Sequence, residues 1–152
     1  MGIHEEVLGK ISALDRNTAA REEFLAAVCR LLKQSFAHYD WVGYYLVDPA
    51  AERQLMLGPF EGEPTEHVRI PFGQGICGQA ADRGTTFVIP DVSLESNYLS
   101  CSVHVRSEIV VPILKEGRVT GELDIDSHTP NAFGADDREL LEKVAEISAR
   151  RL

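Results

Sequence analysis

The sequence predicts an α+β domain in which the terminal helices pack on one face of a central antiparallel sheet. Apolar residues recur at helical spacing near both ends of the chain, whereas residues 41–126 consist mainly of short runs rich in β-branched and aromatic residues. Several turns between these runs are of hairpin length, which indicates antiparallel pairing. Helices segregated at the two ends of a strand-rich stretch are typical of α+β layers.

The helices are predicted from apolar periodicity and from residues that favour helix ends. They are expected at residues 3–14, 18–36, 76–82 and 135–152. Asn17 or Thr18 is the expected N-cap of the second helix, and Gly84 is the expected end of the third. The two ends of the chain therefore supply the helical layer.

The strands are predicted between these helices, at residues 41–47, 53–57, 67–71, 85–89, 107–114 and 118–126. The stretch 57–62 contains two glycines and a proline, and we expect it to form a loop. Residues 90–103 form a longer polar loop. We expect this loop on the face of the sheet opposite the terminal helices.

Length, charge and cysteine count exclude several classes of protein. A chain of 152 residues fits one domain, and its net charge of −9 argues against nucleic acid as a partner. No apolar run approaches the roughly 20 residues of a membrane span, and the N-terminus lacks the features of a secretory signal. The three cysteines argue against a disulfide framework. We expect a cytoplasmic protein.

The strongest acidic signal is the run Glu122-Leu123-Asp124-Ile125-Asp126. Strand alternation places its three carboxylates on one face, and Glu108 in the preceding apolar strand could join them. Converging carboxylates repel one another unless protons or a cation lie between them, and an ammonium group or a metal ion would serve. A solvated strand end without a ligand is the alternative.

The aromatic signal is Trp41 and Tyr45, which alternation places on one strand face with Gly43 between them. A glycine between two aromatic residues leaves a hollow that an apolar ligand group could fill. Ordinary core packing explains the same pattern.

The three cysteines lie in different settings. Cys29 lies at the edge of the apolar stripe of its predicted helix and is expected to be buried. Cys77 begins a helix after Gly-Gln-Gly, where the helix dipole favours the thiolate, so both a reactive and a structural thiol remain open for it. Cys101 lies in the polar loop close to His104 and Arg106, which favours a reactive thiol.

The order and spacing of several segments resemble the free methionine-(R)-sulfoxide reductases, a family of GAF domain proteins. These segments are WVGYYL, LGPFEG, RIPFGQGICGQA, IPDV, a cysteine-bearing loop, SEIVVPI and GELDIDS, over roughly residues 40–127. The resemblance implies a single GAF domain over residues 1–152. In a GAF fold the ligand pocket is expected on the sheet face opposite the terminal helices.

The resemblance also implies roles for individual residues. In that family the cysteine before the SEI motif attacks the sulfoxide, and here this residue is Cys101. The implied pocket consists of Trp41 and Tyr45 around the methyl-sulfoxide end, with Glu108, Asp124 and Asp126 toward the amino group and the sulfoxide oxygen. Neither a metal nor an organic cofactor is required.

Two positions depart from the family pattern. The family usually has a resolving cysteine ten positions before the one in its GxCG motif, and this sequence has His67 there. Glu122 stands where the family typically has an apolar residue. Resolution therefore falls to Cys77 or to an external thiol, or the domain binds its ligand without turnover.

The leading hypothesis is reduction of free L-methionine-(R)-sulfoxide. The Cys101 thiolate attacks the sulfoxide sulfur, Asp126 protonates the departing oxygen, and Cys101 becomes a sulfenic acid. A second thiol condenses with it, and thioredoxin or another thiol reductant completes the cycle. We also expect a homodimer. The alternative is a non-catalytic GAF module that binds a small ligand; Cys101 favours the enzyme and His67 favours the module.

Overall fold

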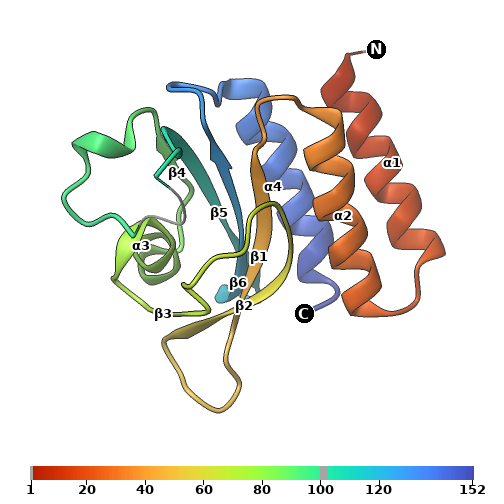
Figure 1. Ribbon diagram of the computed structural model, residues 1–152. Coiled ribbons are helices and arrows are strands. Elements are labelled where there is room, and N and C mark those ends of the chain that lie inside the picture. Colours follow the sequence, from red (N-terminus) through yellow and green to blue (C-terminus); the bar gives the residue numbers. More distant parts are fainter. Residues whose placement is uncertain (1, 100–102) are drawn as a thin grey trace.

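The computed structural model describes residues 2–99 and 103–152, which form an α+β domain (Figure 1). In chain order its elements are α1 (Ile3–Asn17), α2 (Arg21–Ser35), β1 (Trp41–Val47), β2 (Gln54–Glu61), β3 (Arg69–Pro71), α3 (Gly75–Arg83), β4 (Phe87–Ile89), the 3-10 turn η1 (Val92–Leu94), β5 (Ser107–Lys115), β6 (Arg118–Ser127) and α4 (Ala135–Ala149). Among the described residues, no helix has both the length and the apolar character that a membrane span requires.

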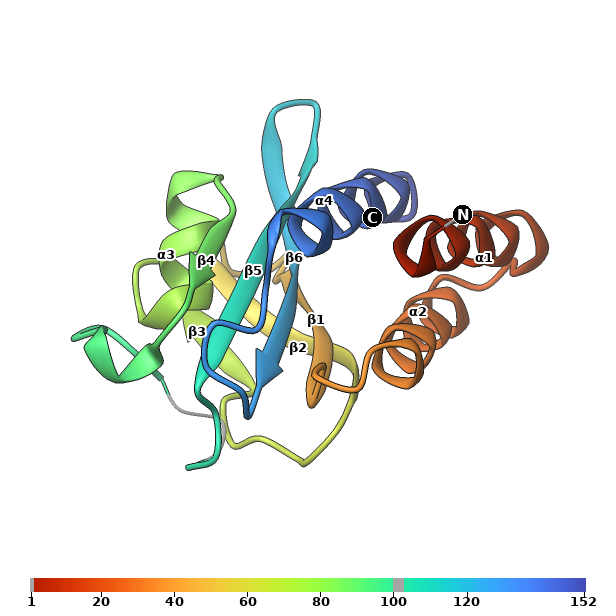
Figure 2. The ribbon, with the colours of Figure 1, turned by 90° about the horizontal axis from the view of Figure 1, so that it is seen from above.

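The strands form one sheet in the order β3-β2-β1-β6-β5-β4, and every neighbouring pair is antiparallel. Seen from above, α1, α2 and α4 lie on one side of the sheet and α3 lies on the other (Figure 2). The prediction of an antiparallel sheet with the terminal helices on one face is therefore confirmed. The face beneath α3 remains available for a ligand.

Each face of the sheet has its own apolar cluster. The larger one joins α1, α2 and α4 to residues such as Val42 and Leu123, and it contains Cys29, which is fully buried as predicted. The smaller one lies beneath α3 and contains Trp41, Tyr45 and Cys77. Helices α2 and α4 cover one face of the sheet and α3 covers part of the other, whereas α1 packs on α2 and α4.

The prediction of a loop at residues 57–62 is wrong, because β2 continues to Glu61. Its register with β1 shifts between Gly43, which pairs with Phe60, and Tyr45, which pairs with Leu57. At this bulge Gly58 and Pro59 lie opposite the single residue Tyr44, so β2 has one extra residue. Proline lacks a backbone N–H, so a bulge tolerates it where a regular ladder does not.

The predicted cap of the second helix is also wrong. Asn17 is the last residue of α1 and Thr18 is its C-cap, whereas α2 has Ala20 as its N-cap without a side-chain hydrogen bond. The predicted end of the third helix is confirmed, because Gly84 caps α3 in the left-handed conformation that glycine adopts without strain.

Candidate functional site

Four acidic side chains lie in a row on the sheet face beneath α3. Strands β5 and β6 pair Glu108 with Asp126, and β6 carries Asp124 and Glu122 at successive positions of the same face. All four are buried, with exposed fractions of 4% or less. The interpretation of these residues as a solvated strand end is therefore wrong.

The aromatic pair lies directly beside this row, because β1 is the other neighbour of β6. Trp41 pairs with Asp126, Gly43 with Asp124, and Tyr45 with Glu122. Residues directly opposite one another in an antiparallel pair share a face. The structure thus brings the predicted aromatic and acidic residues together.

The predicted hollow over Gly43 is not open, because the Trp41 indole fills it. A Cβ built on Gly43 would lie 2.4 Å from Cη2 of Trp41 and 2.9 Å from Cβ of Phe60. Glycine at this position therefore lets the indole lie flat across β1 and stack on Phe60, with ring centroids 5.6 Å apart.

The polar ends of the two aromatic side chains hold the connection between β2 and β3. Trp41 Nε1 donates a hydrogen bond to the Glu63 carbonyl oxygen at 2.9 Å, and the Tyr45 hydroxyl donates to the His67 carbonyl oxygen at 2.9 Å. These bonds fix residues 63–67 at the edge of the acidic row. They also bring His67 to the site.

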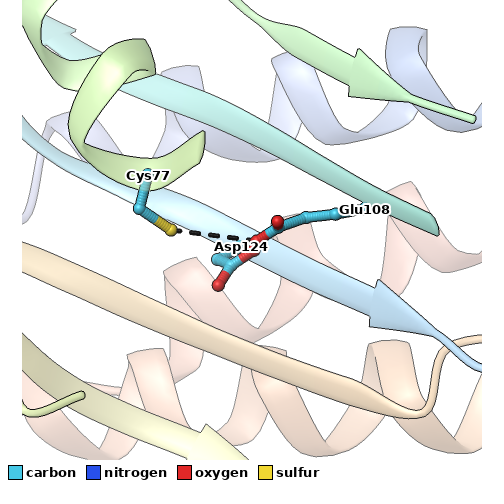
Figure 3. A group of neighbouring side chains, drawn as sticks. All are labelled: Cys77, Glu108 and Asp124. Carbon is cyan, nitrogen blue, oxygen red and sulfur yellow. Dashed lines mark hydrogen bonds between the residues drawn. The ribbon is translucent and has the colours of Figure 1, made fainter. Parts of the chain in front are cut away.

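Cys77 approaches the acidic row from above, in the first turn of α3. Its Sγ atom lies 3.9 Å from Oε2 of Glu108, and Asp124 is beside both groups (Figure 3). Helix α3 approaches β3 closely because Gly78 has no side chain, since an added Cβ at this position would lie 2.5 Å from the Pro71 carbonyl oxygen. The N-terminal helix position predicted for Cys77 is confirmed.

The sequence left both a reactive and a structural thiol open for Cys77, and its surroundings in the structure disfavour the thiolate form. Burial raises the pKa of the Cys77 thiol well above its ordinary value, and the nearby carboxylates, with Asp124 the strongest, raise it further. Both effects oppose a negative charge on sulfur, and they outweigh the dipole of the short helix α3. Cys77 is therefore held as a neutral thiol.

The acidic row also changes the protonation of its own members. Burial raises the pKa of Glu122 well above its ordinary value, and the Asp124 carboxylate raises it further. Burial raises the pKa of Asp124 too, although Glu108 and Cys77 offset part of this effect. Within the described residues, no oxygen of Glu122 or Asp124 has a partner at hydrogen-bonding geometry. These two carboxyl groups require protons or a cation.

We expect Glu122→Gln to stabilise the fold, and more so at high pH. A carboxyl group with a raised folded-state pKa stabilises the native state below its unfolded pKa, and this contribution is lost as pH rises through the folded pKa. The advantage of glutamine should therefore grow from pH 5 to pH 8 and reach at least about 1 kcal/mol, or roughly 3 °C in Tm for a chain of this size.

Thermal unfolding of both proteins across this pH range measures the effect, with the exposed Glu52→Gln variant as the matched control. A Tm difference that does not vary with pH would contradict the raised pKa of Glu122.

A small cavity lies between α3 and the acidic row. It has a volume of about 10 Å³, which is close to the least that one water molecule needs. Its lining is formed by Tyr45, His67, Ile70, Gln74, Gly75, Ile76, Cys77, Leu99, Glu108 and Asp124. This lining contains acidic groups and a thiol but no lysine or arginine.

The sequence interpretation missed Asn97, which anchors the long polar loop to the start of α3. Its Oδ1 accepts a hydrogen bond from the Gly75 N–H at 2.9 Å, and its Nδ2 donates to the Gly73 carbonyl oxygen at 2.8 Å. Leu99 then packs over Gly75, where an added Cβ would lie 2.9 Å from Cγ of Leu99. Only the turn-forming asparagine in a polar loop could have indicated this role.

Cys101, the predicted nucleophile, lies outside the described residues. It follows Leu99, a cavity residue, by two positions in the sequence. The other predicted site residues, Trp41, Tyr45, Cys77, Glu108, Asp124 and Asp126, lie together on the face beneath α3.

Comparisons with known proteins identify a family and several relatives. The GAF domain family model matches residues 20–152. A GAF domain-containing protein A from Dictyostelium discoideum is 37% identical over 95% of this chain and 89% of its own length. The free methionine-R-sulfoxide reductase of Escherichia coli is 34% identical over 83% of this chain and 76% of its own length.

A solved structure with a bound substrate is also similar. The free methionine-R-sulfoxide reductase from Neisseria meningitidis, in complex with its substrate, is 39% identical to this chain. The two structures superpose with a TM-score of 0.91, over 97% of this chain and 87% of the other.

Proposed function

This chain belongs to the GAF domain family, and we propose that it reduces free methionine-R-sulfoxide to methionine. The proposal starts from relatives named free methionine-R-sulfoxide reductase that match most of the chain, one of them solved with its substrate. The observation that carries it is the buried acidic row beside an aromatic pair. Glu108, Asp124 and Tyr45 of these two groups line a cavity to which the described residues contribute no lysine or arginine.

The acidic row suits the ammonium group of a free amino acid. Glu108 and Asp124 both line the cavity, and the carboxyl oxygens of Asp124 have no hydrogen-bond partner within the described residues. An ammonium group donates three hydrogen bonds and carries a positive charge that complements these acidic side chains. Trp41 and Tyr45 offer an apolar wall for the methyl group at the other end of the ligand.

In the proposed reaction, the Cys101 thiolate attacks the sulfoxide sulfur and forms a sulfur–sulfur bond, which breaks again as the protonated oxygen passes to the sulfur of Cys101. The sulfur–oxygen bond of the substrate breaks, methionine leaves, and Cys101 becomes a sulfenic acid. The substrate sulfur is reduced by two electrons and the cysteine sulfur is oxidised by two. Asp126, which is buried opposite Glu108, is the proposed acid that protonates the departing oxygen.

A second thiol must then condense with the sulfenic acid and release water. Cys77 lines the cavity, but burial and four nearby carboxylates keep its thiol neutral, which disfavours it as an attacking group. We propose that an external thiol attacks Cys101 first, and that thioredoxin is the physiological donor. The expected homodimer and cytoplasmic location belong to the same proposal.

The reaction itself is tested by incubating the protein with dithiothreitol and each epimer of free methionine sulfoxide. We expect methionine from the R epimer and little from the S epimer. N-acetylmethionine sulfoxide should be a poor substrate, because it has no ammonium group for the acidic row. Equal reduction of the free and the acetylated compounds would contradict the proposed orientation of the ligand.

We expect His67→Cys to raise the thioredoxin-dependent rate. His67 lines the same cavity as Cys77, and a thiol there would be placed to condense with oxidised Cys101. Steady-state turnover with thioredoxin measures the gain, and mass spectrometry after substrate oxidation should find a disulfide between residues 67 and 101. An oxidised variant that contains no such disulfide would rule out position 67 as a resolving site.

The alternative function, a binding module without turnover, has one observation in its favour. The cavity has room for only about one water molecule, so a methionine-sized ligand must displace part of its lining. In this case the protein would bind methionine sulfoxide and form no methionine with any thiol. The epimer experiment therefore separates the two functions.

A further inference from the structure

The proposed binding of an ammonium group does not involve the thiol of Cys77. Its Sγ atom, a carboxylate oxygen of Glu108 and a carboxylate oxygen of Asp124 lie within 4.8 Å of one another. Figure 3 shows the three side chains converging from α3, β5 and β6. The neutral thiol donates one weak hydrogen bond to Glu108, whereas a thiolate at the same place could bind a cation together with the carboxylates.

Two of the carboxyl groups near the thiol, those of Asp124 and Glu122, have no hydrogen-bond partner within the described residues. Both residues are fully buried. Asp124 points into the cluster, where its oxygen is one of the three neighbouring ligand atoms (Figure 3). A buried carboxylate in this state requires protons or a cation.

A thiolate with two carboxylates is a donor set for a borderline-soft divalent ion. Sulfur favours Zn²⁺ over Mg²⁺ or Ca²⁺, which take oxygen ligands. Tetrahedral zinc has Zn–S bonds of about 2.3 Å and Zn–O bonds of about 2.0–2.2 Å, which places ligand atoms roughly 3.5 Å apart. The observed 3.9 Å between Sγ of Cys77 and Oε2 of Glu108 is close to that spacing.

We propose that Zn²⁺ binds at Cys77, Glu108 and Asp124, with a fourth position left for water or another donor. The ion replaces the thiol proton, because metal-bound cysteine is a thiolate. Binding therefore releases a proton and strengthens as pH rises. The ion places a positive charge beside the buried carboxyl group of Asp124, which has no hydrogen-bond partner within the described residues.

This site overlaps the proposed ammonium site at Glu108 and Asp124. Zinc and free methionine sulfoxide are therefore expected to exclude each other, and zinc should inhibit turnover until a chelator removes it. This competition rests on the proposed function, whereas zinc binding itself does not.

The test is direct titration of the reduced protein with Zn²⁺ by calorimetry, and with Cd²⁺ by the ultraviolet absorption of cadmium thiolate. Both titrations use the Cys101→Ser protein, so that Cys77 is the remaining thiol near the cavity. Cys77→Ala is compared in this background with Cys29→Ala, which removes the buried thiol on the other face of the sheet. Asp124→Asn is the second variant, in case Cys77→Ala does not fold.

We expect one Zn²⁺ per chain and a cadmium thiolate band in the Cys101→Ser protein and in its Cys29→Ala derivative. Cys77→Ala should lose the band. Both Cys77→Ala and Asp124→Asn should weaken zinc binding by at least about tenfold, because loss of a residue that only supports a metal ligand already weakens metal affinity by about 10- to 100-fold. Unchanged zinc binding in both variants, or absence of the band before Cys77 is removed, would overturn the proposal. Zinc binding by a protein whose parent chain forms no methionine even after a chelator has removed the metal would support the metal site and refute the proposed function.

Discussion

We expect Cys101→Ser to reduce methionine formation to the rate observed without protein. A serine hydroxyl is far less acidic and less nucleophilic than a thiol, and it cannot carry the oxygen as a sulfenic acid. Cys101 lies between β4 and β5 in the sequence, in a stretch whose polar composition predicts a loop. The melting temperature of the variant should therefore stay close to that of the parent.

Cys29→Ala is the matched control, because it also removes one thiol. Cys29 is fully buried on the opposite face of the sheet, and its Sγ donates to the Pro59 carbonyl oxygen at 3.5 Å. The control variant should have a lower melting temperature than the parent, but each folded molecule should form methionine at the parent's rate. Methionine formation by Cys101→Ser at the parent's rate would remove Cys101 from the mechanism.

Asp124→Asn is expected to raise the KM for free methionine sulfoxide by about 10- to 100-fold. The ammonium group would lose a charge-assisted hydrogen bond, which contributes roughly 1.5–3 kcal/mol. The variant should be at least as stable as the parent, because Asp124 is a buried carboxyl group whose pKa is raised. A loss of affinity without a loss of stability is the pattern of a binding residue.

N-acetylmethionine sulfoxide supplies the control for this variant, since it has no ammonium group to lose. Its weak reduction should change little between the parent and Asp124→Asn. An equal fall in rate for both compounds would mean that Asp124 supports the site in general and does not bind the amino group.

The features that could be predicted from the sequence depend on local periodicity. Strand alternation was enough to place Glu122, Asp124 and Asp126 on one face, and pairing of β5 with β6 adds Glu108 to that face. The glycine at the end of α3 was predicted because the left-handed conformation there favours glycine.

The features that could not be predicted depend on contacts between distant segments. Gly58 and Pro59 are turn-forming residues, and only the pairing of β2 with β1 shows that they form a bulge within a strand. The protonation of Cys77 depends on how deeply α3 buries it against four carboxylates. The anchoring of the loop by Asn97 links residues more than twenty positions apart.

The central claim is that Cys101 takes the oxygen of free methionine-R-sulfoxide, and a single-turnover experiment tests it most directly. Reduced protein is mixed with excess substrate without any reductant, and both methionine and the oxidation state of each cysteine are measured by mass spectrometry. The proposed mechanism predicts one methionine per chain and one oxidised Cys101, with Cys29 unchanged. An unmodified Cys101 and no methionine after prolonged exposure would contradict it and favour a GAF module that binds without turnover.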